Sequence, residues 1–226
     1  GCAVARCGGA AILRAKGVAS IMTESSVPKP ARCPWAAESH ASAHWTAARA
    51  KELTERICAT YEDEQGINHL DGSNMPQRSA VLDVLAKILE VCFPGYTGRQ
   101  FFDRAGLSFS IGATVNEIFR ELSEQVRRAI AYQCGQDCGD RWECKERAEE
   151  SVLTLLARLP AIRETLKSDI QACLDGDPAA KSPDEVVISY PAAKAIAVHR
   201  IAHELYGAGI PLIPRVMSEV AHTETG

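Results

Sequence analysis

The sequence predicts an all-α protein, and two observations carry this prediction. Apolar residues recur at three- and four-residue spacing in one segment after another, which is the pattern of helices that bury one face. Capping residues, prolines and glycines stand at the ends of these segments, where helices start and stop. With 226 residues, of which 46% are hydrophobic, the chain can build a sizeable core.

Residues 1–40 are predicted to be a disordered arm in front of a helical domain that covers residues 41–226. Ser, Pro and Ala are concentrated from residue 23 onward, and three prolines between residues 28 and 34 block regular structure. The first 21 residues only superficially suggest a targeting peptide, because Arg14 and Lys16 interrupt the apolar stretch. Met22 is a more natural start, so residues 1–21 are interpreted as upstream translation and the chain as a partial reading frame.

The first two helices are expected on either side of a turn at residues 71–74. In the first, apolar residues from Trp45 to Tyr61 trace one side of a helix that is expected to end near Gly66. The second is stopped by a Pro-Gly pair at residues 94–95 and carries a clear apolar stripe of Val81, Leu85, Ile88 and Cys92.

The middle of the chain predicts three further helices. One is expected to begin at Thr114, where Thr114 and Glu117 form a capping box, and to continue through Ile130. Two shorter helices are expected between residues 147 and 174, divided by Pro160, because proline is well placed at a first helical position.

Three helices are expected at the end of the chain, and only the first is in dispute. Residues 186–190 taken alone read as a strand, since β-branched residues dominate them. However, Ser182 and Glu185 form a capping box around Pro183, so a short helix that ends before Pro191 is favoured. Another helix is expected from residue 191 to about residue 206, and the last from residue 211 towards residue 222.

Charge and cysteine usage exclude several classes of protein. The formal net charge of −4 leaves no positive field to neutralise phosphates, which disfavours nucleic acid as a partner. No apolar run approaches the roughly 18 residues that a membrane-spanning helix needs. Nine cysteines without a tight framework argue against a secreted disulfide scaffold, so a soluble protein of the cytoplasm is predicted.

Two groups of residues have the density of a metal site, and neither is predicted to be one. His199 and His203 are one helical turn apart, but Arg200 stands where a zinc protease has its glutamate. Two structural histidines that donate hydrogen bonds within a packed or subunit-facing helix are therefore favoured. The alternative for the cysteine group is a zinc or iron–sulfur loop; its spacing is not standard and a partner pair is missing, so free thiols are favoured for Cys134, Cys138 and Cys144.

Asp177 is the candidate binding residue. It follows the end of a helix and precedes Pro178, so its carboxylate projects from a rigid turn and could pair with an ammonium group. The alternative from spacing alone is that Asp177 only caps this turn, which is an everyday role for aspartate before proline.

Several uncommon short motifs of this sequence resemble motifs in the helical N-terminal domain of serine O-acetyltransferases. They are GDPAAKS at residues 176–182, HRIAHELY at residues 199–206 and SEVAHTETG at residues 218–226. The likeness runs nearly gap-free from about residue 147 to the end, whereas residues 81–128 are similar more loosely, and most to the longer bacterial variety of the family.

The resemblance implies an acyltransferase that moves an acetyl group from acetyl-CoA to L-serine in cysteine biosynthesis. It implies that Asp177 binds serine, and also cysteine as a feedback inhibitor. The catalytic histidine and aspartate, and the coenzyme A surface, are expected in a left-handed parallel β-helix beyond Gly226, so no catalytic or cofactor-binding residue is assigned here and this fragment alone is expected to be inactive. His199, His203 and His222 stay structural.

The resemblance also implies partners. Serine O-acetyltransferases form trimers that these helices commonly pair into hexamers, and they bind cysteine synthase through a C-terminal tail. The alternative interpretation is a non-catalytic helical oligomerisation or regulatory module in which Asp177 is only a cap.

Overall fold

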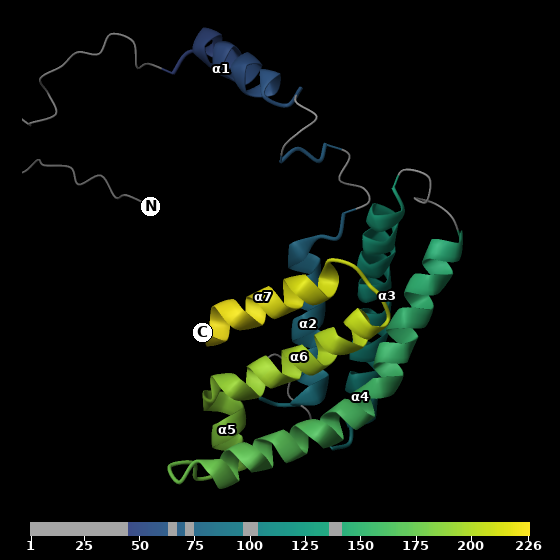
Figure 1. Ribbon diagram of the computed structural model, residues 1–226, viewed down its shortest axis with the longest axis vertical. Coiled ribbons are helices and arrows are strands. Elements are labelled where there is room, and N and C mark those ends of the chain that lie inside the picture. The colour runs from purple at the N-terminus through teal and green to yellow at the C-terminus, as the bar shows by residue number, and fades with distance from the viewer. Residues whose placement is uncertain (1–44, 63–66, 71–74, 97–103, 136–141) are drawn as a thin grey trace, which may run out of the picture. The chain divides into compact units, whose positions relative to one another are not determined.

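The structure, a computed structural model, describes residues 45–62, 67–70, 75–96, 104–135 and 142–226, and within these ranges every regular element is a helix (Figure 1). The all-α prediction is therefore confirmed for the described residues. The predicted arm and the predicted turn at residues 71–74 lie outside them. None of the described helices is both long enough and apolar enough to cross a lipid bilayer.

The chain divides into two units, residues 1–66 and residues 67–226. The first contains helix α1, Ala47–Ala59, which begins at Thr46, whose hydroxyl oxygen accepts a hydrogen bond from the Arg49 backbone N–H at 3.2 Å. The predicted first helix is therefore present, although it ends earlier than expected. No residue of α1 is buried within its unit.

Helix α2, Arg78–Cys92, confirms the second predicted helix. Its predicted apolar stripe is buried, and the chain turns away at Gly95, whose φ of +86° suits glycine. Side chains of other helices satisfy the backbone groups at both of its ends. The Gln125 side-chain oxygen accepts from the Gln77 N–H at 2.8 Å, and Arg163 Nη1 donates to the carbonyls of Val91 and Cys92, the latter at 2.8 Å.

Helix α3, Leu107–Cys134, begins seven residues before the predicted start at Thr114, so that prediction is wrong. Thr114 is buried inside the helix, and its hydroxyl donates to the Ser110 carbonyl at 3.1 Å. A threonine that bonds back to the carbonyl four residues earlier is compatible with a helix interior. The Thr-x-x-Glu pattern therefore did not mark a helix start here.

Helix α4, Trp142–Gly176, is one helix of 35 residues, so the predicted division at Pro160 is also wrong. A proline in a helix interior costs about 3 kcal/mol because it removes a backbone hydrogen bond and crowds the preceding turn. Leu155, Leu159, Ile162 and Leu166 are all buried across this point, and each such side chain stabilises the fold by about 1.5–3 kcal/mol. Burial outweighs the proline, and the helix bends along its length instead of ending (Figure 1).

Helix α5, Pro183–Ser189, decides the disputed segment in favour of a helix. The Ser182 hydroxyl oxygen accepts from the Glu185 N–H at 3.2 Å, and the Glu185 carboxylate accepts from the Lys181 N–H at 2.9 Å. The predicted cap is therefore real, although its glutamate reaches one residue further back than a standard capping box does.

Helix α6, Pro191–Gly207, follows directly, and helix α7, Ile213–Thr225, ends the chain. Helix α7 starts two residues later than predicted, because Leu212 has a φ of +62° and interrupts the helical backbone. Pro214, and not Pro211, is the proline of its first turn.

The second unit has one main core and one small satellite. The main core joins α2, α3, α4, α6 and α7 (Figure 1). The satellite, named the Val186 cluster below, is formed by Ile170 of α4, Val186 of α5 and Ala193 of α6, with the side chains of Phe93, Cys173 and Tyr190 among those packed against it. This cluster fixes the short helix α5 between its two neighbours.

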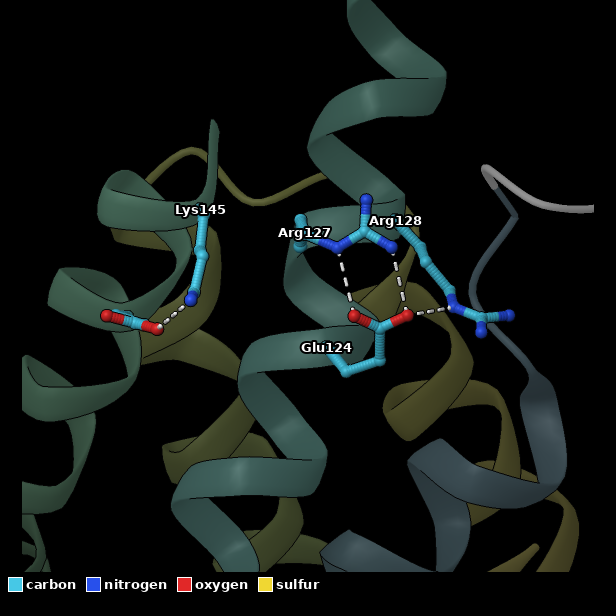
Figure 2. Close-up of polar contacts among 5 residues, drawn as sticks. Glu124, Arg127, Arg128 and Lys145 are labelled. Atoms are coloured by element: carbon cyan, nitrogen blue, oxygen red, sulfur yellow. Dashed lines mark hydrogen bonds and ion pairs between the residues drawn. The ribbon is translucent and has the colours of Figure 1, made fainter. Parts of the chain in front are cut away.

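One group of polar contacts on the surface of α3 is local to that helix. Glu124 lies between Arg127 and Arg128, which donate to its carboxylate oxygens at 2.7–3.0 Å, and Lys145 pairs with Glu149 on α4 in the same view (Figure 2). The hydrogen bonds from Arg127, followed by those from Arg128, lower the pKa of Glu124 to about 2. Such i,i+3 and i,i+4 pairs stabilise a helix face.

Replacing Arg163 with Met should destabilise the chain by about 1–3 kcal/mol, because the last carbonyls of α2 lose their donor while the apolar stem remains. Denaturant unfolding followed by circular dichroism measures the effect. Arg158→Met on the same helix is the matched control, since Arg158 is exposed and reaches Glu204 only at 3.4 Å. Equal losses in the two variants would contradict the capping role.

Replacing Glu124 with Gln should cost less than about 1 kcal/mol at neutral pH, since the carboxylate is 40% exposed and its pairs are screened by water. Because folding lowers this pKa, the stabilisation is fully present above the unfolded value of 4.5 and is lost as the pH falls through about 2. Unfolding free energies of the two proteins should therefore converge at the acid end. Glu164→Gln, which removes a more exposed pair with Lys167, is the control and should change less.

Candidate functional site

The turn between α4 and α5 holds Asp177 in a fixed backbone position. The Asp177 N–H continues the helical pattern by donating to the Cys173 carbonyl at 3.2 Å, just after α4 ends at Gly176. The Asp177 carbonyl then accepts from the Ala180 N–H at 3.0 Å, which closes a turn around Pro178. The rigid turn predicted from the Asp-Pro pair is therefore present.

Two donors orient the carboxylate of Asp177. The backbone N–H of Ala179 donates to Oδ1 at 2.9 Å, and the hydroxyl of Tyr190 donates to Oδ2 at 2.6 Å. An ionised carboxylate has about four lone-pair sites, so each oxygen can still accept from a further donor. The group is only partly buried, so a ligand can reach it.

Tyr190 occupies the junction of two helices. It ends α5 and precedes α6, with φ −88° and ψ 118°, the extended conformation that a following proline favours. Its N–H donates to the Val186 carbonyl at 3.1 Å, and its own carbonyl accepts from the Ala193 N–H at 3.1 Å. Since the ring packs on the Val186 cluster, both the backbone and the side chain of Tyr190 are fixed.

The bond between these side chains shifts both pKa values in opposite directions. The Tyr190 hydroxyl, helped by the Ala179 N–H, lowers the pKa of Asp177 below its ordinary value of 3.8. The carboxylate in turn raises the pKa of Tyr190 to about 12. At neutral pH the site therefore presents a neutral phenol and a negative carboxylate, which suits a cationic group.

The structure also contains the hydrogen bond that a purely capping role of Asp177 requires. A side-chain oxygen that accepts from the backbone N–H two residues later is an Asx turn, and the Asp177–Ala179 bond is one. Asp177 therefore caps its turn, and the cap uses only part of its hydrogen-bonding capacity. The neighbouring Asp175 lies on the exposed helix end, where it accepts from Gln171 Nε2 at 2.7 Å.

The histidines do not converge on this site. His199 and His203 are exposed on α6, where their rings stack with centroids 6.0 Å apart, and neither donates a hydrogen bond to another described residue. The predicted hydrogen bonds are therefore not found within the described part of this chain, and those of a subunit-facing helix stay a prediction. Arg200 between them pairs bidentately with Asp169 of α4, at 2.7 Å for both bonds. His222 is exposed on α7.

The cysteine group is only partly described. Cys134 is exposed at the end of α3 and Cys144 is buried near the start of α4, whereas Cys138 lies outside the described residues. Elsewhere, Cys58, Cys92 and Cys173 are free thiols. Burial raises the pKa of Cys92 to about 11, which makes this thiol a poor nucleophile. Among the described residues, no three His, Cys, Asp or Glu side chains are grouped to hold a metal ion.

Sequence reasoning missed Tyr190 as part of the site. Its partner Asp177 is 13 residues away, with a whole helix between them, so no local pattern joins the two. The available signal was a tyrosine directly before the proline that opens a helix, because such a residue is held extended and its side chain has a fixed direction.

The pKa of Asp177 can be measured in this chain by following the carboxyl ¹³C shift from about pH 7 to about pH 2. A value below 3.8 is expected, because both donors favour the ionised form. The stabilisation from these bonds is then present above the unfolded pKa and is lost as the pH falls through the folded one. A measured value at or above 3.8 would show that the two hydrogen bonds do not form in solution.

Comparisons with known proteins give one consistent answer. A serine acetyltransferase of a Synechococcus elongatus plasmid is 34% identical over 155 residues, which cover 67% of this chain and 49% of that protein. A serine acetyltransferase of Bacillus subtilis is 44% identical over 61 residues, which cover 27% of this chain and 28% of that protein. The chain thus spans about half the length of the Synechococcus relative and less than a third of the length of the Bacillus relative. No protein-family model matches it.

Solved structures show the same fold. Serine acetyltransferase isoform 3 of Entamoeba histolytica in complex with cysteine has a TM-score of 0.50 at 20% identity, covering 79% of this chain and 57% of that one. Serine acetyltransferase 1 of the same organism in complex with L-cysteine has a TM-score of 0.50 at 21% identity, covering 79% and 60%. By sequence and by its helical fold, the chain belongs to the serine acetyltransferase family.

Proposed function

We propose that the protein containing this helical domain is a serine O-acetyltransferase, which transfers an acetyl group from acetyl-CoA to the hydroxyl of L-serine. The observation that carries this proposal is the 34% identity to a serine acetyltransferase over 67% of the chain. The product, O-acetylserine, is an activated form of serine for cysteine biosynthesis.

Asp177 is proposed to bind the ammonium group of serine. Its carboxylate is negative, is held by two donors, and keeps lone pairs for a further bond. A charged hydrogen bond of this kind is stronger than a neutral one, and its direction orients the amino acid. The same charge would accept the ammonium group of cysteine, which is compatible with feedback inhibition at the serine site.

The chemical step needs groups that are not assigned to this chain. As the serine hydroxyl attacks the thioester carbonyl, a general base takes its proton, and the thiolate of coenzyme A leaves. The catalytic histidine and aspartate and the acetyl-CoA surface are proposed to belong to a β-helix outside residues 1–226. Asp177 contributes the orientation of one substrate, not the proton transfer.

The proposal includes an oligomer in the cytoplasm. Large apolar side chains remain exposed on the second unit, and trimers or hexamers would cover such side chains; examples are Leu153, Ile188 and Tyr206, at 55%, 70% and 73% exposure. Binding to cysteine synthase is proposed to use a C-terminal tail outside this chain. Free thiols at Cys58, Cys92 and Cys173 suit a reducing compartment.

A second candidate is a non-catalytic oligomerisation or regulatory module. The Asx turn favours it, since capping alone accounts for the bond between Asp177 and Ala179. The two candidates differ in what the carboxylate contributes to amino-acid binding, which can be measured.

Replacing Asp177 with Ala in the complete protein should raise the KM for serine by about ten- to a hundredfold, the range expected when a charged hydrogen bond is lost. Cysteine inhibition should weaken in parallel, while the KM for acetyl-CoA should change little. Initial rates measured with each substrate varied in turn provide these constants.

Asp175→Ala is the matched control, since Asp175 is two residues away, is exposed, and bonds only Gln171 among the described residues. It should leave the KM for serine unchanged. If Asp177→Ala also leaves serine kinetics and cysteine inhibition unchanged, Asp177 is only a cap. Absence of acetyl transfer by the complete wild-type protein would favour the non-catalytic module.

A further inference from the structure

We infer that Tyr190 is a positioning residue for amino-acid binding, because its hydroxyl fixes the orientation in which the Asp177 carboxylate meets the ammonium group. This inference rests on the proposed role of Asp177. Tyr190 itself is not proposed to touch the substrate or the reacting atoms.

The first step of the argument is the geometry of the carboxylate. A carboxylate held at one oxygen can still turn about the bond that joins it to its side chain. Here Ala179 holds Oδ1 at 2.9 Å and Tyr190 holds Oδ2 at 2.6 Å, so the plane of the group is set by two donors. The backbone bond comes from the turn itself, whereas the hydroxyl is the only side-chain donor to Asp177 among the described residues.

The second step is that Tyr190 is itself anchored. Its N–H and carbonyl are both used, by Val186 and Ala193, and Pro191 holds its backbone extended. Its ring packs on a cluster built from α4, α5 and α6. The position of the hydroxyl is therefore determined by three helices, and a precise bond to Asp177 transmits that position to the carboxylate.

The third step is that the hydroxyl remains a donor at working pH. The charged groups near the Tyr190 phenol are Asp177 and Glu185, and the Cys173 thiol also lies close. Both carboxylates disfavour a phenolate, so the proton stays on Tyr190 and points to Asp177. Removal of the hydroxyl would leave the carboxylate with the Ala179 bond alone.

Helix α5 offers a matched control at its other end. There the hydroxyl of Tyr96 donates to the carboxylate of Asp184, in the first turn of the same helix. Tyr96 also lines a cleft with Phe93 and Val187 and thus lies against α5. Tyr96→Phe removes the same kind of bond from the same helix without touching Asp177.

The experiment compares Tyr190→Phe and Tyr96→Phe in the complete protein. Tyr190→Phe keeps the ring in its cluster, so the thermal midpoint should stay within a few degrees of the wild type. Its KM for serine should rise by about three- to tenfold, while kcat and the KM for acetyl-CoA change less than about twofold. Tyr96→Phe should leave all three constants unchanged. In this chain, Tyr190→Phe should also raise the pKa of Asp177 in the carboxyl ¹³C titration.

Asp177→Asn and the double variant Asp177→Asn, Tyr190→Phe complete a mutant cycle. If Tyr190 acts through Asp177, adding Tyr190→Phe to Asp177→Asn should raise the KM for serine no further. Additive effects would overturn the inference, as would equal changes in both KM values, which indicate a general structural role.

The outcomes separate this inference from the proposed function. A normal KM for serine in Tyr190→Phe together with a raised KM in Asp177→Asn overturns the positioning role and leaves the serine site in place. A normal KM in Asp177→Asn removes the serine site from Asp177, and the positioning role with it. If Tyr190→Phe does not fold, its pKa measurement and kinetics are replaced by those of Tyr190→Leu, which keeps an apolar side chain in the cluster and has no hydrogen-bond donor.

Discussion

The constraint on which the second unit depends is that α4 remains one helix through Pro160. The buried side chains on both sides of the proline stabilise the fold by more than the missing backbone bond costs. Because the helix continues, the single helix α4 packs on α3 as well as on α5 and α6. Beyond Pro160, Arg163 caps α2 and Asp169 binds Arg200 of α6. A break at Pro160 would separate these contacts from the main core.

Helix α4 also positions Asp177, which lies in the turn directly after it. Helix α4 ends at Gly176, the backbone of Asp177 still bonds to Cys173, and the Val186 cluster ties the end of α4 to α5 and α6. The carboxylate is thus attached to rigid elements through its backbone and through the Tyr190 hydroxyl. A carboxylate supported in this way would lose little freedom on binding the ligand proposed above, which is the physical meaning of preorganisation.

The sequence predicted helices well where apolar spacing and caps agreed, and less well where one signal stood alone. Val81 to Cys92 and Ser182 to Glu185 combined several signals, and both elements were confirmed. Thr114 and Pro160 were each interpreted as boundaries from local chemistry, yet both lie inside helices, because tertiary burial outweighs a local preference.

One residue of the candidate site could be predicted from the sequence and the other could not. Asp177 was predicted from its Asp-Pro turn and from resemblance, and the turn is present, while its binding role stays a prediction. Tyr190 could not be predicted as its partner, since the contact depends on how α5 folds back between them. Contacts across a folded helix depend on three-dimensional packing that spacing along a chain does not contain.

The bond between Asp177 and Tyr190 also closes a ring of chain around α5, a helix of seven residues with Val186 as its buried residue. Short elements with little buried area open more readily than the global fold, on a free-energy scale that amide hydrogen exchange reports. Each opening of α5 releases the phenol and thereby the carboxylate. If Asp177 binds an amino acid as proposed, affinity at this turn would be linked to the local unfolding equilibrium of α5, and the bound amino acid would slow the exchange of the amides of α5.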